Sequence, residues 1–160
     1  MNKLTLHQAL LAKLSADLQV AQRAAQTAYE AATHEENIAE NKYDTLGLEA
    51  SYLATGQARR VEEIKAALKA CQELDVQPYD DAQGIHLGAL LTLENSNGQQ
   101  QKLFLAPAGA GLKLDVEGQQ VTVITPRAPL GQSLLGKREE DEVEIVVAGS
   151  RQGFSIIAVQ

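Results

Sequence analysis

LTLHQALLAKLSADLQVAQRAAQTAYEAAT, at residues Leu4–Thr33, carries the clearest structural pattern in the chain. Apolar residues recur in it every seven positions, in two series. The first series is Leu4, Leu11, Leu18, Ala25 and Ala32, and the second is Leu14, Ala21 and Ala28, with His7 one heptad earlier. This heptad spacing is typical of a coiled-coil helix. With Thr5 and Gln8 as a capping box, it predicts a helix from near Leu6 to about Thr33, about 40 Å long.

A helix of this length with one apolar stripe needs a partner. Residues 46–74 supply one, because their stripe positions fall at spacings of three and four: Leu46, Ala50, Leu53, Gln57, Val61, Ile64, Leu68 and Cys71. Two runs of similar length with a short connection predict a long antiparallel coiled-coil hairpin over residues 1–76. Cys71 lies on the stripe and has no base near it in the sequence, so we interpret it as a core residue rather than a nucleophile.

The connection between the two runs is acidic. Residues Glu30–Glu49 hold six acidic residues against one lysine, a net charge of −5, whereas the whole chain carries −7. Like charges gathered at the tip of a hairpin repel each other and oppose folding. The arrangement favours a tip that presents carboxylates to a cation or a basic partner. An ordinary solvated turn is the alternative interpretation.

The composition changes after Pro78, in a linker that we place at residues 77–83. Residues 84–160 then carry short alternating apolar runs, which predict strands over 87–94, 101–106, 112–116, 121–124, 142–147 and 154–159. Asn95–Gly98 is a strong hairpin signal between the first two strands. Residues 149–153 are expected to form the loop between the last two.

A short helix is expected between the fourth and fifth strands. Thr125 can cap it, Pro126 can occupy its first turn, and Gly136 can end it. Strands that follow one another through turns, with one helix packed on them, make an antiparallel β domain. The fold class is therefore α+β, with an N-terminal helical hairpin and a C-terminal strand domain over residues 84–160.

Composition and motifs exclude several classes of function. A net charge of −7 and a pI near 4.9 argue against sequence-specific binding of nucleic acid. No apolar run is long enough to span a membrane, and the first residues are not a signal peptide. A single cysteine fits a reducing compartment, so we expect a cytoplasmic protein, and we expect a monomer. The three histidines, His7, His34 and His86, lack metal-site spacing, and no phosphate-binding or nucleophile motif is present, so an enzyme with its own active site is not expected.

Two segments resemble the Gre family of bacterial transcript-cleavage factors (GreA/GreB). VITPRAPLGQSLLGKREEDEVEI, residues Val123–Ile145, is similar to that family's strand, Ser-Pro, short helix ending in Leu-Ile-Gly-Lys, acidic residues and strand. HLGALLTLENSNGQ, residues His86–Gln99, resembles its opening strand and hairpin. The resemblance implies an FKBP-like C-terminal domain that docks on RNA polymerase near the mouth of its secondary channel. It also implies a hairpin that reaches through that channel.

The same resemblance implies roles for particular residues. The tip carboxylates of Glu35, Glu36 and Glu40 would act in the polymerase active site, where the polymerase itself cleaves backtracked RNA. Glu36 and Glu40 would hold a Mg²⁺ shared with the polymerase, and no cofactor would be bound by the chain alone. Carboxylate oxygens are suitable ligands for this ion. Thr125 and Pro126 would be the polymerase-binding residues.

The tip departs from the family's Asp-x-x-Glu-Asn pattern. Aligning Glu36–Asn37 with its Glu-Asn puts Thr33 where the Asp should be. Aligning Glu40–Asn41 puts Asn37 there. Either register keeps one Glu and loses the Asp. The alternative hypothesis is therefore a non-cleaving regulator of RNA polymerase that occupies the secondary channel with the same architecture.

Two further hypotheses stay open. The fold analogy suggests a peptidyl-prolyl isomerase, but such pockets rely on aromatic walls and this chain has only Phe104 and Phe154 and no Trp. The other is an adaptor whose hairpin binds some other protein.

Overall fold

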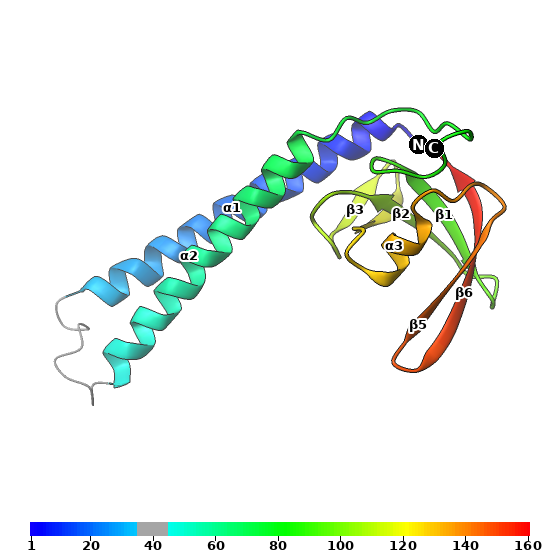
Figure 1. Ribbon diagram of the computed structural model, residues 1–160. Coiled ribbons are helices and arrows are strands. Elements are labelled where there is room, and N and C mark those ends of the chain that lie inside the picture. The colour runs from blue at the N-terminus through cyan, green and yellow to red at the C-terminus, as the bar shows by residue number, and fades with distance from the viewer. Residues whose placement is uncertain (35–44) are drawn as a thin grey trace. The chain divides into compact units, whose positions relative to one another are not determined.

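The computed structural model describes residues 1–34 and 45–160. The elements in chain order are α1 (Lys3–Thr33), α2 (Thr45–Gln72), β1 (Leu90–Asn95), β2 (Gln100–Leu105), β3 (Lys113–Val116), β4 (Gln119–Ile124), α3 (Pro129–Leu134), β5 (Glu142–Val147) and β6 (Ser150–Val159) (Figure 1). The chain forms two compact units, one of residues 13–69 and one of residues 1–12 together with residues 70–160. The predicted end of the hairpin at residue 76 and the predicted start of the strand domain at residue 84 stay predictions. The first residues of α1 and the last residues of α2 belong to the same compact unit as the strands.

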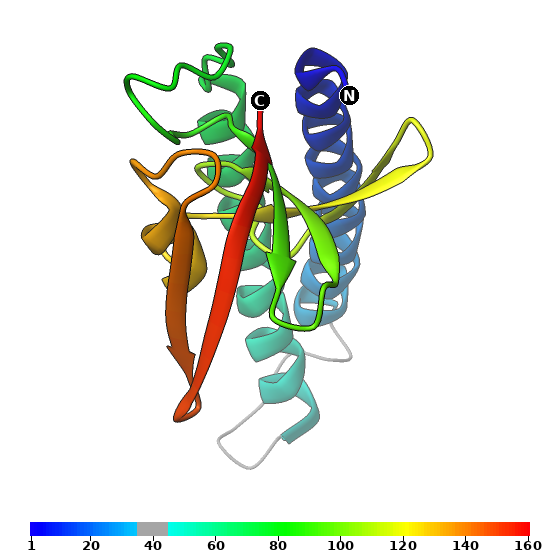
Figure 2. The same ribbon diagram turned by 90° about the vertical axis from the view of Figure 1, so that its right-hand side faces the viewer.

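The unit of residues 13–69 is a pair of antiparallel helices that lie side by side in both views (Figures 1 and 2). Its core is formed by Ala21, Val61 and Ile64, with Leu18 and Ala25 packed against them. The predicted helical hairpin is confirmed. The second stripe is less buried than its spacing suggests, because Leu46 is 66% and Leu53 is 56% exposed. From residue 21 onward the seam residues of α1 are alanines. Because alanine side chains are small, they cover little apolar area of the α2 residues beside them.

The start of α1 differs from the expected capping box. The Oδ1 atom of Asn2 accepts hydrogen bonds from the backbone N–H of Leu4 at 2.8 Å and of Thr5 at 3.3 Å. Asn2 therefore caps the helix, which begins at Lys3 rather than near Leu6. Leu4 was expected in the seam and is 62% exposed, whereas Leu6 and Leu10 are fully buried.

The second unit is built on one six-stranded sheet with the order β3-β4-β2-β1-β6-β5. The α+β class, with a helical hairpin and a strand domain carrying one short helix, is confirmed. The expected antiparallel pairing holds for four strand pairs of the described sheet, but β2 and β4 are parallel, from Lys102↔Val121 to Leu105↔Ile124. After β2 the chain forms β3, and the next strand, β4, then lies between β3 and β2. Such a crossover leaves no local signal, because turn and strand patterns report only neighbours in sequence.

Both faces of the sheet are covered over part of their area. On one face, Leu134 of α3 is fully buried in a cluster with strand residues such as Leu91 and Ile156. On the other, a β-carbon at Gly109 would lie 3.4 Å from Leu10 Cδ1 and 3.7 Å from Val123 Cγ1, so the start of α1 packs near β4. His7 Nε2 lies 2.7 Å from the carbonyl oxygen of Cys71 and ties the two helix ends together.

The β5–β6 hairpin is longer than expected. Residues 149–153 were expected to form a loop, but pairing continues from Glu142↔Ser155 to Val147↔Ser150. Ala148 and Gly149 make the turn with φ values of 51° and 80°. Two successive positive φ values are typical of the type I′ turn, whose twist matches that of the flanking strands. The polar residues after the turn therefore belong to β6.

Candidate functional site

The connection from β4 to α3 contains the two expected partner-binding residues. The carbonyl oxygen of Thr125 accepts a hydrogen bond from the N–H of Ala128 at 3.1 Å, which closes a turn. Ala128, with φ −79° and ψ 148°, is the N-cap, and Pro129 follows in the first turn. The expectations that Thr125 caps the helix and that Pro126 occupies its first turn are both wrong. The residue before a proline avoids helical backbone, so Pro129 keeps Ala128 extended and the helix begins after it.

Gly131 lets α3 lie directly against the end of β4. A β-carbon at this position would be 2.0 Å from the carbonyl oxygen and 2.7 Å from the carbonyl carbon of Thr125. No side chain fits such a space, so the contact requires glycine. The sequence signal for this role was a glycine inside a short helical pattern, which indicates close packing.

The far end of α3 is held equally firmly. Gly136 donates its N–H to the carbonyl oxygen of Ile85 at 2.8 Å, and Ile85 donates to that of Lys137 at 2.8 Å. Gly136 has φ 78°, which confirms that it terminates the helix. The segment from Thr125 to Gly136 is therefore fixed to the sheet unit at both ends.

The exposure of this segment changes which of its residues can touch a partner. Thr125 is only 5% exposed, and Pro126 is half-buried. Arg127, Pro129 and Gln132 are exposed. Thr125 therefore shapes the segment, whereas Arg127 presents a cation. Sequence reasoning missed Arg127, although it is the single charged residue between Thr125 and Gly136.

The acidic residues after α3 have structural roles. Arg138 donates through Nε to the carbonyl oxygen of Asp81 at 2.6 Å, and its backbone N–H donates to Asp141 Oδ2 at 2.8 Å. Glu139 Oε1 accepts from the N–H of Val159 at 2.9 Å. These contacts agree with the expected polar turn before β5. Within residues 1–34 and 45–160, no three Asp, Glu, His or Cys side chains are placed to hold a metal ion.

Burial controls the ionisation of two groups in the sheet unit. Burial raises the pKa of the Cys71 thiol, and the contact of Sγ with the carbonyl oxygen of Ala108 at 3.6 Å only partly opposes this. The thiol is thus a protonated core group, as the stripe position predicted. Burial also lowers the pKa of Lys3, whose ammonium group donates to the carbonyl oxygen of Gln77. In the described helices there is no apolar stretch that could span a membrane.

Comparisons with known proteins bear on the predicted family. No family model matches the chain. It is 25% identical over 101 residues to transcription elongation factor GreA of Cereibacter sphaeroides (strain ATCC 17025), a match that covers 63% of this chain and 60% of that protein. It is 26% identical over 100 residues to GreA of Jannaschia sp., covering 62% and 60%. The resemblance to the Gre family is confirmed. The match spans about three fifths of the length of these Gre relatives.

Among solved structures, the Gre-like chain is similar to GreA factor homolog 1 of Thermus thermophilus. The two are 18% identical, 95% of each chain is covered, and the TM-score is 0.38.

The tip carboxylates expected from the Gre resemblance, Glu35, Glu36 and Glu40, lie outside the described residues. The Mg²⁺ ligation expected of Glu36 and Glu40 is therefore still a prediction. At the end of α1, the hydroxyl of Thr33 donates a hydrogen bond to the carbonyl oxygen of Tyr29 at 2.8 Å. This is the local bond that a threonine makes inside a helix. In one of the two alignments of the tip with the Gre pattern, Thr33 stands at the expected Asp, and its hydroxyl binds its own backbone.

Proposed function

We propose that this chain is a transcription elongation factor that binds bacterial RNA polymerase at the secondary channel and promotes cleavage of backtracked RNA. The observation that carries the proposal is the match over 101 residues to a protein named transcription elongation factor GreA. The paired helices α1 and α2 and the firmly held segment before α3 support it, because they supply the two parts that such a factor needs. In this proposal the chain is not itself an enzyme.

The docking part of the proposal concerns the segment that ends in α3. Pro126 and Arg127 would contact the polymerase, and buried Thr125 would hold them in position. Gly131 and Gly136 would keep the segment rigid, so little conformational entropy would be lost on binding. An exposed arginine at the centre of such a surface would form charge-assisted hydrogen bonds with carboxylates of the partner.

The catalytic part concerns the acidic tip. Glu36 and Glu40 would offer carboxylate oxygens to the Mg²⁺ that the polymerase shares, and Glu35 would add negative charge beside them. That ion, when bound, would lower the pKa of a water molecule and orient it for attack on the RNA phosphate. The chain's own carboxylates would supply ligands, and the polymerase would supply the rest of the site.

A non-cleaving channel regulator is the second candidate. The tip sequence favours it, because either alignment with Asp-x-x-Glu-Asn replaces the Asp by Thr33 or Asn37. A tip with fewer properly placed carboxylates would still enter a basic channel by charge attraction. Such a factor would compete with cleaving Gre factors without shortening the RNA.

Backtracked elongation complexes with end-labelled RNA would distinguish these candidates. The purified chain should shorten the RNA in the presence of Mg²⁺, and Glu35→Gln, Glu36→Gln and Glu40→Gln should each be compared with it. Glu30→Gln is the matched control, since Glu30 is acidic and exposed but belongs to α1. Binding without shortening would contradict cleavage and leave the non-cleaving regulator. Absence of binding would contradict both.

A further inference from the structure

The strand β5 forms one edge of the sheet. In the strand order β3-β4-β2-β1-β6-β5 it pairs with β6 and with no other strand in the described parts of the chain. An edge strand presents unpaired backbone groups, to which another extended segment can add. The pairing register of β5 with β6 shows which backbone N–H and C=O groups of β5 are unpaired.

The backbone groups of alternate residues face the open edge. Ile156 donates its N–H to the carbonyl oxygen of Asp141 at 2.9 Å, which fixes a hydrogen-bonded pair just before β5. Hydrogen-bonded pairs recur every second residue in an antiparallel ladder. The backbone groups of Val143, Ile145 and Val147 therefore point toward β6. Those of Glu142, Glu144 and Val146 point outward.

The end of this hairpin is apolar and exposed. Val146 is 60% exposed and Val147 is 44% exposed, and both lie next to the turn of the hairpin. Natural edge strands are commonly protected by lysine or proline, and β5 contains neither residue. The exposed aliphatic side chains and outward backbone groups together make an edge suited to pairing.

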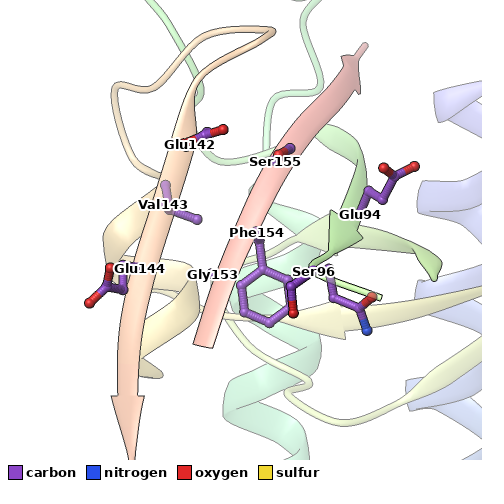
Figure 3. A pocket seen from close by; sticks show the side chains of 9 residues that line it. Glu94, Ser96, Glu142, Val143, Glu144, Gly153, Phe154 and Ser155 are labelled. Atoms are coloured by element: carbon purple, nitrogen blue, oxygen red, sulfur yellow. The ribbon is translucent and has the colours of Figure 1, made fainter. Parts of the chain in front are cut away.

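Charge indicates what kind of segment fits. Glu142 and Glu144 alternate with Val143 along β5 and, with Glu94 of β1, border a hollow of about 460 Å³ that Phe154 also lines (Figure 3). Glu144 has one cationic neighbour, Arg151 at 3.6 Å, and this pair is largely exposed. Glu94 accepts a hydrogen bond from the amide of Gln100 at 3.0 Å. Glu142 and Glu144 therefore give β5 itself a negative charge, whereas Glu94 lies two strands away on β1.

We propose that the open edge of β5 binds an extended basic segment of a partner protein, which adds to the sheet as a seventh strand. Outward groups of Glu142, Glu144 and Val146 would supply the main-chain hydrogen bonds. Lysine or arginine side chains two residues apart would lie opposite Glu142 and Glu144, and an aliphatic side chain would lie opposite Val146. Nucleic acid is disfavoured by the carboxylates, and a second copy by the net charge of −7 on each chain. The inference does not depend on polymerase binding.

The test uses the full chain and a seven-residue peptide with one valine and two lysines at alternating positions and threonines between them. Amide chemical shifts measured by NMR should change on titration, most strongly at Glu142, Glu144 and Val146. The same peptide with glutamates for lysines should bind about tenfold more weakly, since two favourable cross-strand pairs become unfavourable.

Variants locate the binding surface. Glu144→Lys should weaken binding of the lysine peptide about tenfold, whereas Asp115→Lys, the matched change on the opposite edge strand β3, should leave it unchanged. Val146→Pro should also weaken it, because the outward N–H is lost while the ladder to β6 is kept. Thermal unfolding would check that each variant is folded. Equal binding of both peptides, shift changes away from β5, or edge-to-edge dimers in sedimentation would each overturn the proposal.

Discussion

The carbonyl oxygen of Thr125 occupies the place that a side chain on Gly131 would need: a β-carbon there would lie 2.0 Å from it. Because this oxygen belongs to the backbone at the end of β4, it cannot rotate away, and α3 would have to move instead. Gly131→Ala should therefore lower the free energy of unfolding by about 1–3 kcal/mol, the usual cost of overpacking. Urea unfolding followed by circular dichroism measures this change. An unchanged midpoint would show that α3 is free to shift.

Gly56 provides the opposite case on α2. A β-carbon at Gly56 would have no atom within 4 Å. Glycine in the interior of a helix costs about 1 kcal/mol relative to alanine. Gly56→Ala should therefore raise the free energy of unfolding by up to about 1 kcal/mol in the same urea experiment. A loss of stability would mean that the middle of α2 is not a regular helix.

The assignment of Asn2 as the cap of α1 can be tested against the capping box that the sequence suggested. Asn2→Ala removes the acceptor of two backbone N–H groups and should cost about 1 kcal/mol of stability. Thr5→Ala should cost less, since Thr5 lies inside the helix as the structure has it. The reverse order of the two losses would restore Thr5 as the cap.

Burial of Cys71 predicts a pH dependence of stability. Its raised pKa means that the folded chain keeps the thiol proton at a pH where the unfolded chain, with an ordinary value of 9.0, loses it. The unfolded state therefore binds fewer protons as the pH rises through 9, and the contribution of Cys71 to stability falls above that pH. Cys71→Ala should show a smaller fall between pH 8 and 10 than the native chain. Equal slopes would contradict the raised pKa.

The exposed Arg127 of the segment proposed to dock on the polymerase leads to a binding prediction. Arg127→Glu should weaken binding to core RNA polymerase by about tenfold, because the loss of a charge-assisted contact at an interface costs at least about 1.4 kcal/mol. Lys113→Glu, an equal charge change at an exposed residue of β3, is the control. Equal effects of both variants would point to net charge rather than to a specific contact.

The sequence predicted what local patterns determine. The heptads located the paired helices, and Leu14, Ala21 and Ala28 are buried as expected. Alternation located β5 at residues 142–147, the bounds that the structure shows. These features depend on residues close together in the chain, which is why spacing alone reveals them.

The errors have a common physical cause. The parallel pairing of β2 with β4 depends on a long crossover, and the burial of Thr125 depends on how Gly131 packs against it. Asn2 rather than Thr5 caps α1, and Pro129 rather than Pro126 occupies the first turn of α3. Each of these residues lies three positions from the one that was expected. Tertiary contacts decide each of these cases, and a single sequence does not display them.

The decisive measurement is equilibrium binding to core RNA polymerase. The labelled chain should bind in a saturable manner, and unlabelled GreA should displace it completely, because both are proposed to occupy the same site at the secondary channel. Failure to bind, or binding that GreA does not displace, would contradict the proposed function.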